Sequence, residues 1–187
     1  MPDDKAPDAA SLHQAALDYL ARYAATQAGL RQVLRRRIDR WARAQPDAEA
    51  AEQSATAARA AVDAVVQRLA EAGVLSDAAF AESRARGLVR SGQSTRSIQM
   101  RLVAKGVAPD LARSAAAADP RTELAAALVL ARKRRIGPYR VAEDADAAVR
   151  MKETGVLARA GFSRDIAEQA LQTSREDAEA RIFELRR

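Results

Sequence analysis

The chain has no cysteine and only one histidine, His13, among its 187 residues. The lack of cysteine excludes disulfides, cysteine-based zinc sites and thiol chemistry, and one histidine cannot build a multi-histidine metal site. The glycines are isolated and form no phosphate-binding loop. No motif places a nucleophile beside a base or pairs two carboxylates. We therefore predict a protein that is not an enzyme and that uses no metal or cofactor.

Large apolar side chains are also scarce. The chain has 3 Phe, 3 Tyr and 1 Trp, and alanine makes up about a quarter of it, so the 48% hydrophobic content overstates the apolar area available for burial. A thin stack of helices suits this composition, because each unit need only bury a narrow stripe against its neighbours. Alanine, leucine, arginine and glutamate favour helix, and no stretch alternates with period two. The predicted fold class is all-α.

Long hydrophobic runs are absent as well. No apolar stretch approaches the length of a membrane span. The N-terminal sequence MPDDKAPDAASLHQ is acidic and lacks the apolar centre of a signal peptide. We therefore expect a cytoplasmic protein without a membrane partner. We also expect a monomer, because no long apolar heptad seam is present.

The most complete helix signal is the stretch STRSIQMRLVAKGV at residues 94–107. Ser94 is a good N-cap, because its hydroxyl can accept a hydrogen bond from an amide of the first turn. Ile98 and Leu102 lie four residues apart and share one face of the helix. Gly106 can adopt the left-handed conformation that ends a helix. Two residues form a cationic stripe beside the apolar face, namely Arg101 and Lys105.

This template recurs along the chain. Thr26, followed by Leu30 and Leu34, repeats the offsets of the cap and the two apolar positions, and Gly161-Phe162 repeats the glycine end 55 residues later. The third copy departs from the pattern, with Val149 at the predicted cap position and Glu153 at the first apolar position. A helical unit repeated about three times is therefore the main organising signal.

The net charge of +6 is unevenly distributed. Basic residues outnumber acidic ones by seven to one over residues 20–43, by six to none over 84–106 and by five to none over 132–140, whereas acidic residues dominate 44–83 by seven to two. Most such runs are solvated helix faces. Because the basic clusters recur in a repeat array, we favour a shared cationic surface, the footprint expected for polyanions. The candidate binding residues are Arg31, Arg35, Arg36, Arg40, Arg84, Arg86, Arg90, Arg96, Arg101, Lys105, Arg132, Lys133, Arg134 and Arg135.

Five segments occur in a characteristic order: LDYLARYAATQAGLRQVL at 17–34, VLSDAAFAES at 74–83, STRSIQMRLVAKGVAPDL at 94–111, LARKRRIG at 130–137 and LARAGFSRDIAEQAL at 157–171. Together they span roughly residues 12–172, and in this order they resemble the RecX family of bacterial RecA regulators. No segment is a catalytic signature, so the resemblance depends on the ordered set.

The resemblance implies three tandem three-helix repeats stacked in an elongated, curved array, to which this chain adds a C-terminal helical extension. We expect an acidic connector at 45–54, a long helix at 55–72 and a first helix that starts at Ser11 or Leu12. The predicted boundaries are a disordered N-terminal tail at 1–10, a first repeat with a long insertion at 11–75, a second repeat at 76–119, a third repeat at 120–172 and a C-terminal helix at 173–187.

The resemblance also implies the partner. Members of this family bind RecA filaments on single-stranded DNA, within the filament groove, and modulate recombinase, ATPase and coprotease activities. The expected action here is inhibition, with single- or double-stranded DNA as a secondary partner. Two alternatives stay open: a general nucleic-acid-binding helical module that acts without RecA, and a helical protein-interaction scaffold whose arginines are merely solvated.

Overall fold

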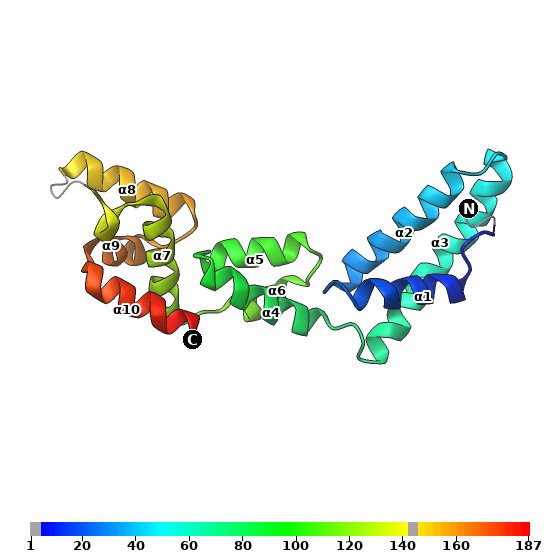
Figure 1. The fold of residues 1–187 in the computed structure, drawn as a ribbon, viewed down its shortest axis with the longest axis horizontal. Helices are drawn as coiled ribbons and strands as arrows, with labels where there is room; N and C mark the ends of the chain where they lie inside the picture. The colour runs from blue at the N-terminus through cyan, green and yellow to red at the C-terminus, as the bar shows by residue number, and fades with distance from the viewer. Residues whose placement is uncertain (1–4, 142–145) are drawn as a thin grey trace. The chain divides into compact units, whose positions relative to one another are not determined.

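The computed structural model describes residues 5–141 and 146–187. All its regular secondary structure is helical over these ranges, which confirms the predicted all-α class (Figure 1). The α-helices are α1 (Ala9–Leu20), α2 (Gln27–Arg43), α3 (Ala48–Glu71), α4 (Asp77–Arg90), α5 (Thr95–Ala104), α6 (Pro109–Ala116), α7 (Pro120–Arg134), α8 (Ala147–Arg159), α9 (Arg164–Gln172) and α10 (Arg175–Arg186), with a short 3-10 turn η1 (Gly137–Tyr139) after α7.

Two predicted element boundaries in the first repeat are wrong, and each error involves an aspartate cap. Helix α1 begins at Ala9, inside the segment predicted as disordered tail, because the Asp8 carboxylate accepts a hydrogen bond from the Ser11 amide at 2.9 Å. This contact and the neighbouring Lys5 lower the pKa of Asp8 to about 2. Helix α3 begins at Ala48, inside the predicted connector, because Asp47 caps it. Residues 1–4 of the predicted tail lie outside the described residues.

The chain divides into two compact units. The first comprises Met1–Phe80 with Lys105–Val107. Its core lies mainly between α2 and α3, where Leu34 and Ile38 of α2 share a buried cluster with Val62 and Leu69 of α3. The long helix of the predicted insertion therefore supplies one wall of this core.

The second unit comprises Ala81–Ala104 and Ala108–Arg187. Its main cluster forms where α7 packs against α9 and α10, with Leu128, Leu157 and Phe162 buried together. Ile182 of α10 is 1% exposed, so the C-terminal helix docks on this core instead of extending into solvent. The extension is thus an integral part of the second unit.

The repeated sequence template corresponds to a repeated hydrogen-bond pattern at two buried helix caps. The Ser97 amide donates to the Ser94 hydroxyl at 3.2 Å, as predicted, and that hydroxyl donates in turn to the Ala160 carbonyl at 2.7 Å. Thr26 acts in the same way, since its hydroxyl accepts from Gly29 and donates to the Lys105 carbonyl at 2.6 Å. A hydroxyl can both accept and donate, whereas a carboxylate can only accept.

The third copy does not need this double role. Helix α8 is capped by Asp146, whose carboxylate accepts from the Val149 amide at 2.7 Å, so the cap lies three residues before the predicted cap position. No carbonyl in the described residues accepts a hydrogen bond from this cap. An aspartate is therefore sufficient where the cap has only to accept.

Substitutions at Ser94 test the double role. Ser94→Thr should be tolerated, whereas Ser94→Ala should lower the free energy of unfolding by about 2 kcal/mol, because both the cap and the bond to Ala160 are lost. Ser163→Ala, which removes the solvent-exposed cap of α9, is the matched control and should cost about 1 kcal/mol. Urea denaturation followed by circular dichroism measures these values. Equal losses in the two alanine variants would contradict a donor role for Ser94.

Candidate anion-binding site

The predicted basic residues of α2 fall into two groups. Arg31 and Arg35 turn toward α3, where their guanidinium nitrogens lie 2.7 and 3.7 Å from the two carboxylate oxygens of Asp63. Arg36 and Arg40 are exposed and form no ion pair within the described residues. Part of the predicted charge on this helix is therefore matched by an acidic residue of α3.

The basic residues of α4 and of the end of α5 face solvent. Arg84, Arg86, Arg90 and Lys105 are all exposed. Arg86 approaches Glu82 at 3.9 Å, one turn earlier on the same helix, an arrangement that contributes little in water. These residues are available to a partner.

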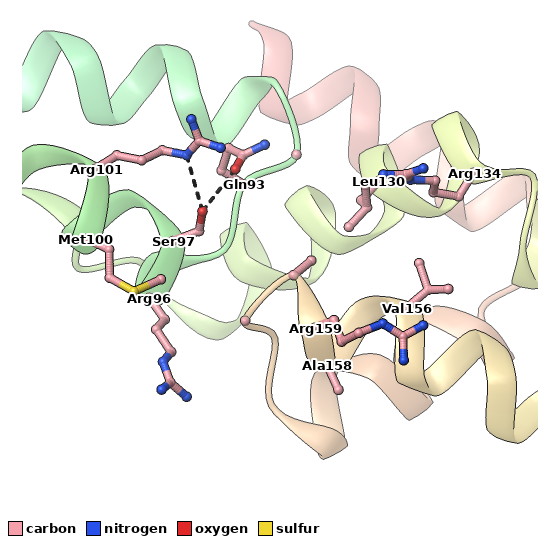
Figure 2. Close-up of a pocket in the computed structure, with 13 residues that line it drawn as sticks. Gln93, Arg96, Ser97, Met100, Arg101, Leu130, Arg134, Val156, Ala158 and Arg159 are labelled. Atoms are coloured by element: carbon pink, nitrogen blue, oxygen red, sulfur yellow. Dashed lines mark hydrogen bonds between the residues drawn. The ribbon is translucent and has the colours of Figure 1, made fainter. Parts of the chain in front are cut away.

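The basic run at the end of α7 divides by helical position. Arg132 pairs with Glu179 of α10 at 3.1 Å, and the Lys133 ammonium donates to the Ser91 carbonyl at 2.7 Å. Arg135 ends the helix with a φ of 56°. These contacts give the Arg132 and Lys133 side chains a structural role, the Arg135 side chain is exposed, and Arg134 remains on the side that faces α5 and α8 (Figure 2).

A cationic pocket lies between α5, the end of α7 and the end of α8, within the second unit. Its volume is about 790 Å³. Four arginines line it: Arg96 and Arg101 from α5, Arg134 from α7 and Arg159 from α8. Among the described residues of the lining, none is acidic. In Figure 2, Arg96 extends away from α7 and α8, whereas the other three surround the hollow.

Local sequence explains how these side chains reach the pocket. Ile98 and Leu102 are fully buried, so the other side of α5 must present its arginines outward. Arg134 and Arg159 occupy the last turns of their helices, where a positive charge complements the negative end of the helix dipole. Three helices therefore bring arginines to one place.

One of these arginines is held by a short hydrogen-bond chain. The Arg101 Nε donates to the Ser97 hydroxyl at 3.4 Å, and that hydroxyl donates to the Gln93 side-chain oxygen at 3.0 Å (Figure 2). Neither terminal Nη group of Arg101 has a hydrogen-bond partner within residues 5–141 and 146–187, so both can contact a ligand. A guanidinium offers five donors, so such anchoring uses only one of them.

Arg159 was not among the sequence-predicted residues. It lies outside the three basic segments, and the 55-residue repeat aligns it with Ala104, which carries no charge. The only local signal is a basic residue in the last turn before Gly161. The juxtaposition with Arg101 and Arg134 depends on how α5, α7 and α8 pack.

Other kinds of site find no support in the parts of the chain that the structure describes. Over residues 5–141 and 146–187, no group of three or more His, Cys, Asp or Glu side chains could hold a metal ion. None of the helices in these ranges is both long enough and apolar enough to cross a membrane. The cationic pocket and the exposed arginines are the features that remain to be explained.

Comparison with known proteins gives consistent matches. A family model described as "RecX, second three-helix domain" matches residues 76–115. The chain is 39% identical over 165 residues to the "Regulatory protein RecX" of Myxococcus xanthus (strain DK1622), which covers 87% of this chain and 85% of that protein. It is 41% identical over 105 residues to the protein of the same name from Agrobacterium fabrum (strain C58 / ATCC 33970), and the matched stretch covers 56% of this chain and 55% of that protein.

Solved structures show the same fold. The crystal structure of RecX from Lactobacillus salivarius matches with a TM-score of 0.66 at 21% identity, over 92% of this chain and 97% of that one. A second crystal structure, of a regulatory protein RecX, also has a TM-score of 0.66 at 21% identity, over 88% of this chain and 72% of that one. At this identity the structural matches speak for the fold, an array of tandem three-helix repeats.

Proposed function

Because the chain belongs to the RecX family of regulatory proteins, we propose that it regulates RecA by binding the RecA–single-stranded DNA filament and inhibiting its recombinase, ATPase and coprotease activities. The observation that carries this proposal, beside family membership, is the set of cationic side chains that are exposed and lack ion pairs among the described residues. Arg84 and Arg90 of α4 and Arg101 of α5 belong to this set. Acidic filament surfaces and DNA phosphates are complementary to it.

Physical occlusion is the mechanism that we propose. A chain of tandem helical repeats can contact several subunits of a polymer at once, so individually weak contacts add up to a high overall affinity. No catalytic step is required, because a regulator that covers the filament blocks the movements of RecA and the access of its substrates. Binding should weaken steeply with salt, since ion pairs with phosphates release counterions.

A second candidate function rests on the cationic pocket. The three arginines that surround the hollow, Arg101, Arg134 and Arg159, would also suit a nucleic-acid-binding module that acts without RecA. Such a module predicts tight binding to bare DNA or RNA and no effect on ATP hydrolysis by RecA. A helical scaffold with merely solvated arginines predicts neither effect.

One assay tests the proposed function. RecA ATPase activity on single-stranded DNA is titrated with this protein, beside a measurement of binding to bare DNA. We expect inhibition of the ATPase at concentrations where binding to bare DNA is weak. A variant with five charge reversals, Arg84→Glu, Arg86→Glu, Arg90→Glu, Arg101→Glu and Lys105→Glu, should lose inhibition by at least about tenfold, because each lost charge contact weakens a multivalent complex.

The control for this variant must change the charge equally at other positions. Five exposed arginines outside the predicted surface and the pocket serve for it: Arg113, Arg121, Arg150, Arg164 and Arg186. The control variant should inhibit as the unmodified protein does, and both variants should keep their helical circular dichroism. Equal inhibition by the two variants would refute the assigned surface, and no inhibition by the unmodified protein would refute the proposed function.

A further inference from the structure

The pocket between α5, α7 and α8 differs from the other arginine environments of the chain. Some other arginines are matched with acids, as Arg31 is with Asp63 and Arg132 with Glu179. Others, such as Arg36 and Arg84, form no ion pair within the described residues, but each is exposed on the surface of a single helix. Over the described residues, no carboxylate pairs with any arginine of the pocket, namely Arg96, Arg101, Arg134 and Arg159. Like charges brought together by three helices repel each other, and an anion that enters the pocket relieves this repulsion.

We propose that this pocket binds consecutive phosphate groups attached to a nucleoside, supplied either by the backbone of a single-stranded nucleic acid or by the tail of a free nucleotide. The proposal rests on the proposed function, because binding to the RecA–single-stranded DNA filament would bring such phosphates to the pocket. It assigns the pocket arginines to phosphate contacts and leaves Arg84, Arg86 and Arg90 of α4 to other parts of the partner.

Phosphates fit this pocket better than acidic side chains do. Several charges must enter one hollow together to neutralise its arginines. Consecutive phosphates are covalently linked, so their charges arrive as one group, whereas each acidic side chain of a peptide must be ordered separately at an entropic cost. The planar guanidinium also offers paired donors that match two oxygens of one phosphate.

The rest of the lining suits the nucleoside that carries the phosphates. Met100, Leu130 and Val156 contribute apolar surface beside the arginines, and the Met100 side chain is 58% exposed. Sulfur and aliphatic groups of this kind can contact a sugar or the face of a base without selecting its sequence. The volume of about 790 Å³ lies within the ordinary range of small-molecule sites.

The helices that carry these arginines are packed together before a ligand arrives. The weak hydrogen bond from Arg101 Nε to the Ser97 hydroxyl, at 3.4 Å, favours one direction of the guanidinium group (Figure 2). Arg134 and Arg159 project from the last turns of two helices that belong to the same compact unit as α5. Such preorganisation reduces the entropy lost on binding.

The test measures binding in the absence of RecA, with the full chain and three fluorescent probes: a short single-stranded oligothymidylate, a fluorescent ATP analogue and a polyglutamate peptide. The variant replaces Arg101, Arg134 and Arg159 by glutamine. The matched control replaces Arg113, Arg164 and Arg186 by glutamine. These arginines are exposed and lie outside the pocket, and both variants lose three charges.

We expect at least one phosphate-bearing probe to bind the unmodified protein and the control with similar affinity. The same probe should bind the pocket variant at least about tenfold more weakly. If the oligothymidylate binds, we plot the logarithm of its binding constant against the logarithm of the salt concentration. The slope of this plot should be shallower by about 2 in the pocket variant, roughly 0.7 for each of three lost phosphate contacts. Binding of the oligothymidylate alone identifies a strand, and binding of the ATP analogue alone identifies a free nucleotide. Circular dichroism shows that both variants remain folded.

Three outcomes would overturn this proposal: no binding of either phosphate probe, equal binding by the pocket and control variants, or polyglutamate binding that depends on the same three arginines. The last would assign the pocket to acidic protein segments. None of these outcomes affects the ATPase test of the proposed function, because that test requires only inhibition of RecA. The two proposals can therefore fail separately.

Discussion

Gly106→Ala is expected to lower the free energy of unfolding by about 3 kcal/mol. Gly106 has a φ of 85°, in the left-handed region, where any Cβ is strained. An added Cβ would also lie 2.3 Å from the Cβ of Ala28, a contact inside the first unit that no rotamer change can relieve. Backbone strain contributes about 1 kcal/mol and the overpacking about 2 kcal/mol. Urea denaturation of the full chain measures the loss.

Gly73 provides the control for this substitution. Its φ of 71° is also left-handed, but nothing lies within 4 Å of the position that a Cβ would take. Gly73→Ala should therefore show the strain alone, about 1 kcal/mol. Ala28→Gly should recover part of the loss in the Gly106→Ala background, since it removes the clashing methyl. A loss in Gly106→Ala no greater than in Gly73→Ala would show that the close approach to Ala28 is unimportant.

Glu153→Ile is expected to lower the free energy of unfolding by about 3 kcal/mol, although it restores the residue type of the other two repeats. Leu30 and Ile98 are fully buried at the equivalent positions, and Glu153 is only 6% exposed. Its carboxylate accepts hydrogen bonds from the Arg140 guanidinium, one of them at 2.9 Å from Nε, and from the Gly137 amide at 3.3 Å. The hydrogen bonds to Glu153 raise the pKa of the Arg140 guanidinium, which stays charged.

Removal of the carboxylate alone leaves the partly buried Arg140 cation, whose side chain is 20% exposed, without its partner. Loss of one member is the costly way to break such a pair. The double variant Glu153→Ile, Arg140→Leu should therefore be more stable than Glu153→Ile alone and close to the unmodified protein. A double-mutant cycle built on urea denaturation, with Arg140→Leu as the fourth member, measures the interaction free energy. Additive effects of the two substitutions would show that the pair does not act as a unit.

Much of the fold could be predicted from local sequence. The spacing of Ile98 and Leu102 predicts a buried helix face, and both side chains are fully buried. Ser94 caps α5 as expected, and Gly106 has the left-handed backbone expected after it. Capping, periodicity and glycine ends are interactions between residues a few positions apart, so they can be read without the tertiary structure.

The errors arose where two local signals competed. Ser11 and Asp8 can both cap a helix, and the structure uses Asp8 because its carboxylate meets the Ser11 amide. The acidic, proline-containing segment after α2 resembles a loop, yet Asp47 is enough to start α3 directly after it. Sequence periodicity locates helix interiors better than helix ends.

What the sequence determined by itself is a set of repeated, capped helices with an excess of arginine and an order of segments typical of one family. The tertiary structure decided which arginines are available to a binding partner. It joins Arg132 to Glu179, 47 residues away, and brings the unpredicted Arg159 to the same pocket as Arg101 and Arg134. It also gives Ser94 a second partner and Glu153 a counter-ion. The physical reason is that helix formation depends on neighbours within one or two turns, whereas ion pairs and pockets depend on distances between helices that are remote in the chain.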